Sequence, residues 1–235
     1  CQDRQPAGRR GLRAALMAKR VDEMTLDELR LALAPAVARA AAFDGWSAAA
    51  LDQAAAELGV EPAVARLAFP GGAMDMIDAW TASTDAAMQA RFADGSLHNM
   101  KVRQRIATLV RFRLEHVAGL EESLRRALAI QAMPQNLARS LRLGWRAADA
   151  MWRLAGDTAT DYNHYTKRMT LGGIYAATLA VFVDDESEGK ADSWAFLDRR
   201  IDGIMRFEKA KAQLLTGREH FDVARFLGRL RYPAR

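Results

Sequence analysis

Few side chains in this sequence could do chemistry, and those few are poorly grouped. Asp161 and His164 stand three residues apart, the spacing with which di-iron helix bundles place a carboxylate and an imidazole on one metal. Such a centre needs a second acid-x-x-His pair, yet none of the other histidines has an acid three residues before it: they are His98, His116 and His220. We therefore predict no metal site, and we expect Asp161 to cap the helix that follows it.

Motifs of the common enzyme classes are also missing from the sequence. It contains no nucleophile elbow around a serine, no glycine-rich phosphate loop and no His-Glu-x-x-His zinc motif. Gly172-Gly173 lies within an apolar helical stretch, where the close approach of another helix explains it more simply than a nucleotide does. We predict a protein with no catalytic residue and no cofactor, which acts by binding. An independent enzyme stays as an alternative.

The elements that would position a site are helices throughout. Thr25-Leu26-Asp27-Glu28 has capping-box spacing, Ser47 can cap a second helix that Gly59 ends, and Glu61-Pro62 can open a short third helix. Strand alternation is essentially missing. Apolar spacings of three and four predict later helices at about 74–88, 98–119, 121–132, 134–155, 161–183, 189–214 and 218–231. The predicted fold class is all-α, with about ten helices.

Residues 41–72 form a helix, a Gly-Val turn and a short helix, and this arrangement resembles the helix-turn-helix of TetR-type repressors. In those repressors the third helix enters the major groove, where basic side chains bind phosphates and polar ones read base edges. Here Arg66 is the one polar side chain of that helix, and residues 44–80 carry six acidic groups and one basic group, a net charge of −5. We predict a vestigial helix-turn-helix that binds no nucleic acid. A divergent TetR-type regulator is the alternative function.

The two ends of the chain are basic. Residues 1–20 hold six basic groups and one acidic group, as in a flexible tail or the remnant of a targeting segment. Residues 218–231 form an amphipathic helix whose apolar face adjoins a basic one, a pattern typical of helices in a membrane interface. Docking of this helix on its own core is the alternative. The candidate membrane-binding residues are Val223, Arg225, Phe226, Leu227, Arg229 and Leu230.

The most specific motifs lie between Trp152 and Ile201, and they resemble the Coq-nine family of coenzyme Q biosynthesis accessory proteins. They are Trp152-x-x-Ala155-Gly156-Asp157, Thr160-Asp161-Tyr162-Asn163, Tyr165-Thr166-Lys167-Arg168, Ile174-Tyr175 and Trp194-x-Phe196-Leu197-x-x-Arg200-Ile201. The resemblance extends over about residues 26–232. One departure is His164, where mitochondrial members carry Trp. If the residue at this position contacts a partner protein, we expect His164 to make a weaker or altered contact compared with the Trp of the mitochondrial members.

The resemblance implies a TetR-like homodimer that binds lipid instead of DNA. It also implies that the protein rests on a membrane surface and presents prenyl quinone intermediates to the di-iron demethoxyquinone hydroxylase; a phospholipid is the other expected ligand. The implied location is cytoplasmic and peripheral on the inner membrane in a bacterium, or the matrix side of the inner membrane in a mitochondrion. The implied organisation is a basic tail (1–24), a vestigial helix-turn-helix (25–70), a lipid-binding and dimerisation bundle (71–214) and a membrane helix (218–231).

Two sets of site residues follow from this resemblance. Apolar side chains on the last large helices would line a pocket for a quinone head and a prenyl tail, and methionine suits such a site because its unbranched side chain adapts to a flexible ligand. Ordinary core packing and a dimer interface are the alternative. The candidate lipid-binding residues are Met169, Ile174, Tyr175, Phe182, Trp194, Leu197 and Ile201. The candidate partner-binding residues, expected to be exposed, are Met151, His164, Tyr165 and Arg168.

Overall fold

The computed structural model describes residues 23–158 and 162–216, and the regular elements in these ranges are all helices. They are α2 (Leu26–Asp44), α3 (Ala48–Leu58), α4 (Pro62–Ala68), α5 (Ala73–Arg91), α6 (Val102–His116), α7 (Glu121–Gln131), η2 (Pro134–Asn136), α8 (Leu137–Leu154), α9 (Tyr162–Asp184), η3 (Glu188–Lys190) and α10 (Ala191–Thr216). The all-α prediction is confirmed. The expected helix at 218–231, most of the basic tail and the cap Asp161 lie outside the described residues.

Local sequence signals set the ends of the first helices. The Thr25 hydroxyl accepts a hydrogen bond from the Glu28 amide, and the Glu28 carboxylate accepts one from the Thr25 amide at 2.8 Å, which completes the predicted capping box. The Ser47 hydroxyl caps α3 by accepting a hydrogen bond from the amide of Ala50. Gly59 ends α3 with a φ of +70°, in the left-handed region that glycine adopts without steric penalty. These predictions of helix ends are confirmed.

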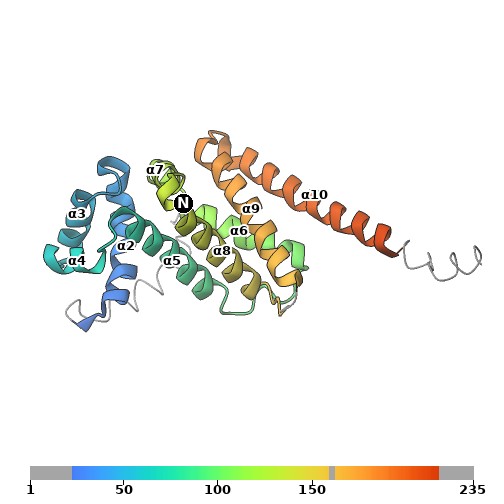
Figure 1. Ribbon diagram of the computed structural model, residues 1–235, viewed down its shortest axis with the longest axis horizontal. Helices are drawn as coiled ribbons and strands as arrows, with labels where there is room; N and C mark the ends of the chain where they lie inside the picture. Colours follow the sequence, from blue (N-terminus) through green and yellow to red (C-terminus); the bar gives the residue numbers. More distant parts are fainter. Residues whose placement is uncertain (1–22, 159–161, 217–235) are drawn as a thin grey trace, which may run out of the picture.

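The helices form a small N-terminal group and a larger bundle (Figure 1). Helices α2, α3 and α4 make the group, and α5 leads out of it. Helices α6, α7 and α8 pack beside α5, and α9 and α10 pack on these in turn. One hydrophobic cluster runs through both parts, from Leu33 of α2 through Trp80 and Met88 of α5 to Phe182 of α9 and Leu197 of α10. The group and the bundle therefore share a core. The last turns of α10 reach beyond the other helices in Figure 1.

Helices α8 and α9 approach each other where both carry glycine. A Cβ on Gly172 of α9 would lie 3.9 Å from the backbone oxygen of Gly144 in α8, whereas a Cβ on Gly173 would meet no atom within 4 Å. The explanation of the glycine pair by close helix approach is therefore correct for Gly172. Gly173 is exposed instead.

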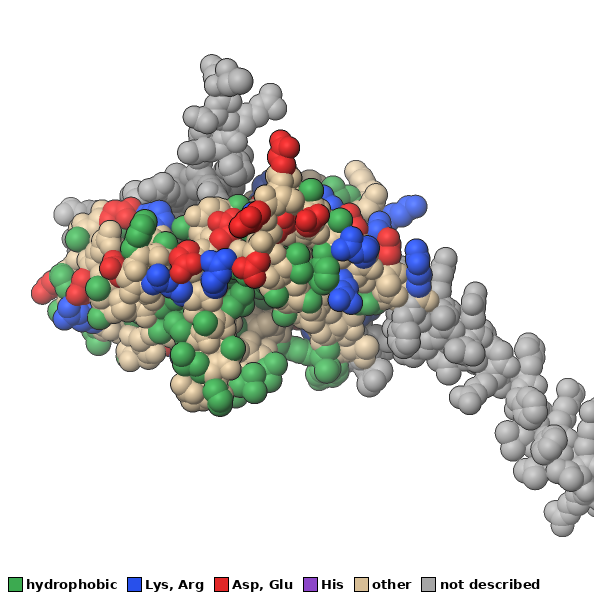
Figure 2. Space-filling view, turned by 90° about the horizontal axis from the view of Figure 1, so that it is seen from above, with side chains coloured by type: hydrophobic (Ala, Val, Ile, Leu, Met, Phe, Trp, Pro, Cys, Tyr) green, Lys and Arg blue, Asp and Glu red, His purple; other side chains and the backbone are tan. Residues whose placement is uncertain are grey.

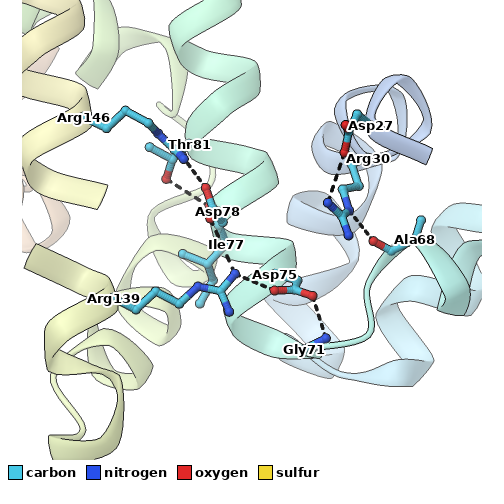
Figure 3. A network of polar contacts seen from close by, with 10 residues as sticks. All are labelled: Asp27, Arg30, Ala68, Gly71, Asp75, Ile77, Asp78, Thr81, Arg139 and Arg146. Carbon is cyan, nitrogen blue, oxygen red and sulfur yellow. Dashed lines mark hydrogen bonds and ion pairs between the residues drawn. The ribbon is translucent and has the colours of Figure 1, made fainter. Parts of the chain in front are cut away.

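Arginines of α8 connect the bundle to the start of α5 (Figure 3). Arg139 pairs with both Asp75 and Asp78 of α5, and Arg146 also pairs with Asp78. Asp75 in turn accepts a hydrogen bond of 2.6 Å from the amide of Gly71, in the turn that follows α4. This network fixes the turn between the N-terminal group and the bundle.

Candidate ligand site and partner surface

Six of the seven candidate lipid-binding residues lie in the core or against it, on helices α9 and α10. Four are buried (Ile174, Phe182, Leu197 and Ile201), and two are partly buried and pack against the core (Tyr175 and Trp194). The rings of Phe182 and Trp194 lie 6.0 Å apart. Met169 differs, because its side chain is 70% exposed. The structure therefore brings six of these residues to one side of the bundle and leaves Met169 on the surface.

A buried charged side chain, Arg113 of α6, lies against one of these residues, Tyr175. It is 1% exposed and is the largest of the fully buried side chains in the described part of the chain. Its guanidinium pairs with Asp85 of α5 and lies over the ring of Tyr175, 5.0 Å from the ring centroid. Among the described residues, no group accepts a hydrogen bond from its Nε. The interior next to Tyr175 thus holds an N–H donor with no acceptor.

Electrostatics keeps Arg113 charged in this setting. Burial by itself lowers the pKa of a guanidinium, but Tyr175 and Asp85 raise the pKa of Arg113 by more than burial lowers it. The sequence analysis missed this residue. A signal was present, since Arg113 is four residues after Leu109 and three after Val110 and so lies on the apolar face of its helix.

Exposed ion pairs close the seam between α6 and α10 beside this site. Arg111 lies 3.0 Å from Asp198 and stacks over the ring of Trp194, and Arg103 lies 2.6 Å from Asp202. Ion pairs with this much solvent contact contribute about 0–1 kcal/mol each. These ion pairs therefore contribute little to the stability of the contact between α6 and α10.

The start of α9 carries an aromatic group with an exposed member. Tyr165 is 58% exposed, and its ring lies 5.2 Å from that of His164 and 5.9 Å from that of Trp145 in α8. His164 itself is half-buried. The expectation of an exposed side chain is thus correct for Tyr165 and correct in part for His164.

The same expectation is wrong for Met151 and Arg168, which are 0% and 2% exposed. Arg168 shares a helix face with His164, as the spacing of four indicates, but that face turns toward α8. There Arg168 donates to Asp149 at 2.6 Å and to Asp157 at 3.0 Å. These two carboxylates hold the arginine in the interior, where it cannot touch a partner directly.

The network around Arg168 ties three segments together. Arg168 also donates to the carbonyl of His164, Lys167 pairs with Asp157 at 2.7 Å, and the indole of Trp152 donates to the carbonyl of Lys167 at 3.0 Å. Helix α8, the residues that follow it and the first turns of α9 are thus held in one arrangement. This arrangement positions Tyr165 and His164 beside Trp145.

Further apolar side chains are exposed on α8 and α9. Leu137 and Leu141 stand one turn apart on α8, and Tyr165 and Met169 stand one turn apart on α9. Seen from above, hydrophobic side chains gather along one margin of the molecule, and charged ones lie together nearer the middle (Figure 2). Exposed apolar side chains in a group are typical of a surface that contacts another protein or a membrane.

The short helix α4 lacks the side chains that would read DNA. Arg66 makes a two-point contact with Asp52 of α3, through Nε at 3.1 Å and Nη2 at 2.5 Å. Val64 and Leu67 of the same helix are exposed. The helix-turn-helix shape is therefore present, but its one cation is engaged within the module and its exposed face is largely apolar.

Two other kinds of site were sought in the described residues. No helix among them is both long enough and apolar enough to cross a bilayer. Within the same ranges, no group of three or more His, Cys, Asp or Glu side chains is arranged to hold a metal ion.

The helix arrangement and the N-terminal helix-turn-helix define a TetR-like fold. The crystal structure of a TetR transcriptional regulator from Nitrosomonas europaea matches with a TM-score of 0.60 at 23% sequence identity, over 74% of this chain and 96% of that one. In sequence, the COQ9 family model matches residues 137–208. Over α8, α9 and much of α10 the chain is therefore similar to the COQ9 family.

Curated relatives agree with this similarity. The chain is 33% identical over 177 residues to the ubiquinone biosynthesis protein COQ9, mitochondrial, of Rattus norvegicus, and 30% identical over 177 residues to the protein of the same name from Homo sapiens. Each match covers 72% of this chain but only 56% and 55% of the relatives. The chain thus spans just over half the length of these relatives.

Proposed function

We propose that this chain acts in ubiquinone biosynthesis as a lipid-binding accessory protein and not as an enzyme. The observation that carries the proposal is the position of the family match. Residues 137–208 cover α8, α9 and much of α10, and these helices hold the candidate ligand and partner residues. The relatives that match over this region are named for ubiquinone biosynthesis.

The ligand in this proposal is a prenylated quinone intermediate, with a phospholipid as the other occupant. The apolar side chains of α9 and α10 would contact the prenyl tail, because burial of apolar surface is the main favourable term for such a chain. The rings of Phe182 and Trp194, whose centroids lie 6.0 Å apart, can pack against the flat quinone ring as well as against the branched prenyl chain. The protein would hold the lipid and deliver it, and another enzyme would carry out the reaction.

The partner in this proposal is the di-iron demethoxyquinone hydroxylase, which would dock at the start of α9. Tyr165 supports this, because it is exposed while its ring is held by neighbouring rings, and a rigid tyrosine of this kind is typical of an interface anchor. The apolar side chains Leu137 and Leu141 on α8 would face a second copy of the chain in a homodimer.

The proposal also includes attachment to a membrane surface through residues 218–231, which lie outside the described residues. The attachment would be on the cytoplasmic face of a bacterial inner membrane or the matrix face of a mitochondrial one. The relatives are named as mitochondrial, which supports the second location. Replacing Phe226 and Leu227 by Asp should abolish sedimentation with anionic liposomes and leave the melting temperature nearly unchanged. A large loss of thermal stability with liposome binding intact would show that this helix docks on the protein core.

Native mass spectrometry of the purified protein, followed by lipid extraction, tests the function itself. We expect a prenyl quinone or a phospholipid to remain bound through purification. A protein that is free of lipid, and that also fails to take up added prenyl quinone, would contradict the proposal.

A further inference from the structure

Arg113 has the properties of a ligand-binding group that the core alone does not explain. It is 1% exposed, it pairs with Asp85, and none of the described residues accepts a hydrogen bond from its Nε. A buried N–H without an acceptor costs free energy, so native proteins retain very few of them, and those that persist often serve a ligand or a bound water. We propose that Arg113 binds the polar head of the lipid by donating its Nε–H to an acceptor oxygen. This inference rests on the function proposed above.

The charges around Arg113 favour a neutral acceptor. Asp85 already balances the guanidinium, and a second full negative charge in this interior would be unbalanced and costly to bury. A quinone ring carbonyl is a neutral acceptor, whereas a lipid phosphate brings at least one further negative charge. Both offer the same hydrogen-bond chemistry, but the carbonyl fits the local charge. The assigned ligand group is therefore the carbonyl of a quinone ring.

Tyr175 is the side chain through which such a ring would reach Arg113. Of Asp85, Arg113 and Tyr175, only Tyr175 has appreciable exposed surface, and its ring lies directly against the guanidinium. A quinone ring is flat, so it can stack on the tyrosine or take its place over the guanidinium. The neighbouring seam between α6 and α10 carries exposed ion pairs, such as that of Arg111 with Asp198, which contribute about 0–1 kcal/mol each and so add little to the cost of parting the two helices.

The residues next to Tyr175 suit the rest of the ligand. Ile174 precedes it on α9, and Phe182 lies two turns further along the same helix. On α10, Leu197 and Ile201 are buried and lie one turn apart. These side chains are apolar, as a prenyl tail requires. A polar head at Arg113 would thus place the tail among the residues that the sequence had already assigned to lipid.

Binding measurements with the purified protein test the inference. The probes are a benzoquinone with a two-isoprene tail, an isoprenoid hydrocarbon with the same tail and no acceptor oxygen, and a short-chain phosphatidic acid, each titrated by calorimetry into the wild type and Arg113→Lys. Lysine keeps the charge but lacks Nε and the planar fork. We expect the substitution to weaken quinone binding by roughly tenfold or more and to leave hydrocarbon binding within about twofold. Arg39→Lys, in the N-terminal helix group and paired there with Glu57, is the control and should bind both probes as the wild type does.

A measurement on the wild type avoids dependence on a variant that fails to fold. The Nε–H signals of Arg113 and Arg168 can be followed by NMR while the same quinone is added. We expect the Arg113 signal to move on saturation and the Arg168 signal to stay, because Nε of Arg168 already donates to Asp149. A stationary Arg113 signal at full occupancy would overturn the inference.

The other outcomes separate this inference from the proposed function. Equal quinone affinity in the wild type and Arg113→Lys would overturn the role of Arg113 while the function stands. If short-chain phosphatidic acid, and not the quinone, depends on Arg113, the assignment to a quinone carbonyl is wrong. A wild-type protein that binds none of the three probes would overturn the proposed function as well.

Discussion

Arg168 in α9 and Arg113 in α6 are almost equally buried, at 2% and 1% exposed, but their surroundings differ. Arg168 donates to two carboxylates and to a backbone carbonyl, and these contacts join α8, the residues after it and α9. Arg113 has one carboxylate and one aromatic face, and its Nε has no acceptor among the described residues. The complete network positions a surface, and the incomplete one leaves a donor available inside the bundle.

The difference also separates two tasks within one bundle. The Arg168 network lies beneath Tyr165 and His164, so it would hold the surface that meets another protein. The pair of Arg113 and Asp85 lies against Tyr175 of α9, one of the candidate lipid-binding residues, so it would meet the ligand. Measurements that perturb one arginine at a time can therefore test whether the two tasks are separate.

The largest effect is expected from Arg168→Met. The substitution removes the buried cation that Asp149 and Asp157 share and leaves them only the more exposed Arg153 and Lys167, so the free energy of unfolding should fall by about 3–5 kcal/mol in a urea titration. Arg153→Met is the matched control, because Arg153 pairs with the same Asp149 but is 74% exposed, and it should cost less than about 1 kcal/mol. A loss below 1 kcal/mol for Arg168→Met would remove the structural role given to this network.

The next effect concerns the other arginine. Arg113→Met alone leaves Asp85 buried and unpaired, so it should lower the free energy of unfolding by about 3 kcal/mol. Adding Asp85→Leu removes that charge, and the double variant should recover most of the loss because apolar residues of similar volume replace a buried ion pair well. Quinone binding should stay weak in both variants. If the double variant is no more stable than Arg113→Met alone, the unpaired charge of Asp85 is not the cause of the lost stability.

A smaller effect, with a defined pH dependence, is expected at Asp185, a buried carboxylate whose partners are neutral. Burial raises the pKa of Asp185, but hydrogen bonds from the hydroxyls and amides of Ser187 and Ser193 lower it by more, so this pKa lies well below its usual range. A carboxylate with a depressed pKa stabilises the fold above its unfolded pKa of about 3.9, and this contribution fades as the pH falls below that value. The melting temperature of Asp185→Asn should therefore be below that of the wild type at neutral pH.

That difference should shrink as the pH falls below about 4, where the wild-type carboxylate begins to lose its advantage. Asp184→Asn, at the exposed neighbouring position, is the matched control and should melt close to the wild type at neutral pH. A difference for Asp185→Asn that is constant from pH 7 to pH 2.5 would contradict the role given to the ionised carboxylate.

The smallest effect on stability is expected from Tyr165→Ala, because most of this side chain is exposed. Its effect on binding should be larger: co-purification with the hydroxylase should weaken by more than about 1 kcal/mol if Tyr165 anchors the contact. Met169→Ala, one turn further along α9 and also exposed, tests how far the contact extends. Unchanged co-purification of Tyr165→Ala would place the contact elsewhere.

Sequence reasoning was most successful where the physics is local. Thr25, Ser47 and Gly59 act on residues within one turn of themselves, so their types and spacing were enough to predict three helix ends. The composition of α4 also predicts that this helix does not read DNA, since Arg66 is its one polar side chain, and this stays a prediction.

Burial of polar side chains could not be predicted in the same way. Spacing indicates that His164 and Arg168 share a face, but the direction of that face depends on carboxylates at positions 149 and 157, which the chain brings back only on folding. Arg113 depends on Asp85, 28 residues away, and on Tyr175 in a third helix. A charged residue on an apolar helix face is the signal that points to such cases, and at Arg113 it was overlooked.

Photo-crosslinking with a prenyl quinone that carries a diazirine in its tail tests the central claim, that the ligand occupies the interior beside Arg113. The purified protein is irradiated with the probe, and the labelled peptides are identified by mass spectrometry. The account predicts labels within 102–116, 171–184 and 191–204, and their loss when unlabelled prenyl quinone is added in excess. Labels confined to the exposed side chains of Tyr165 and Met169, or to residues 218–231, would contradict it.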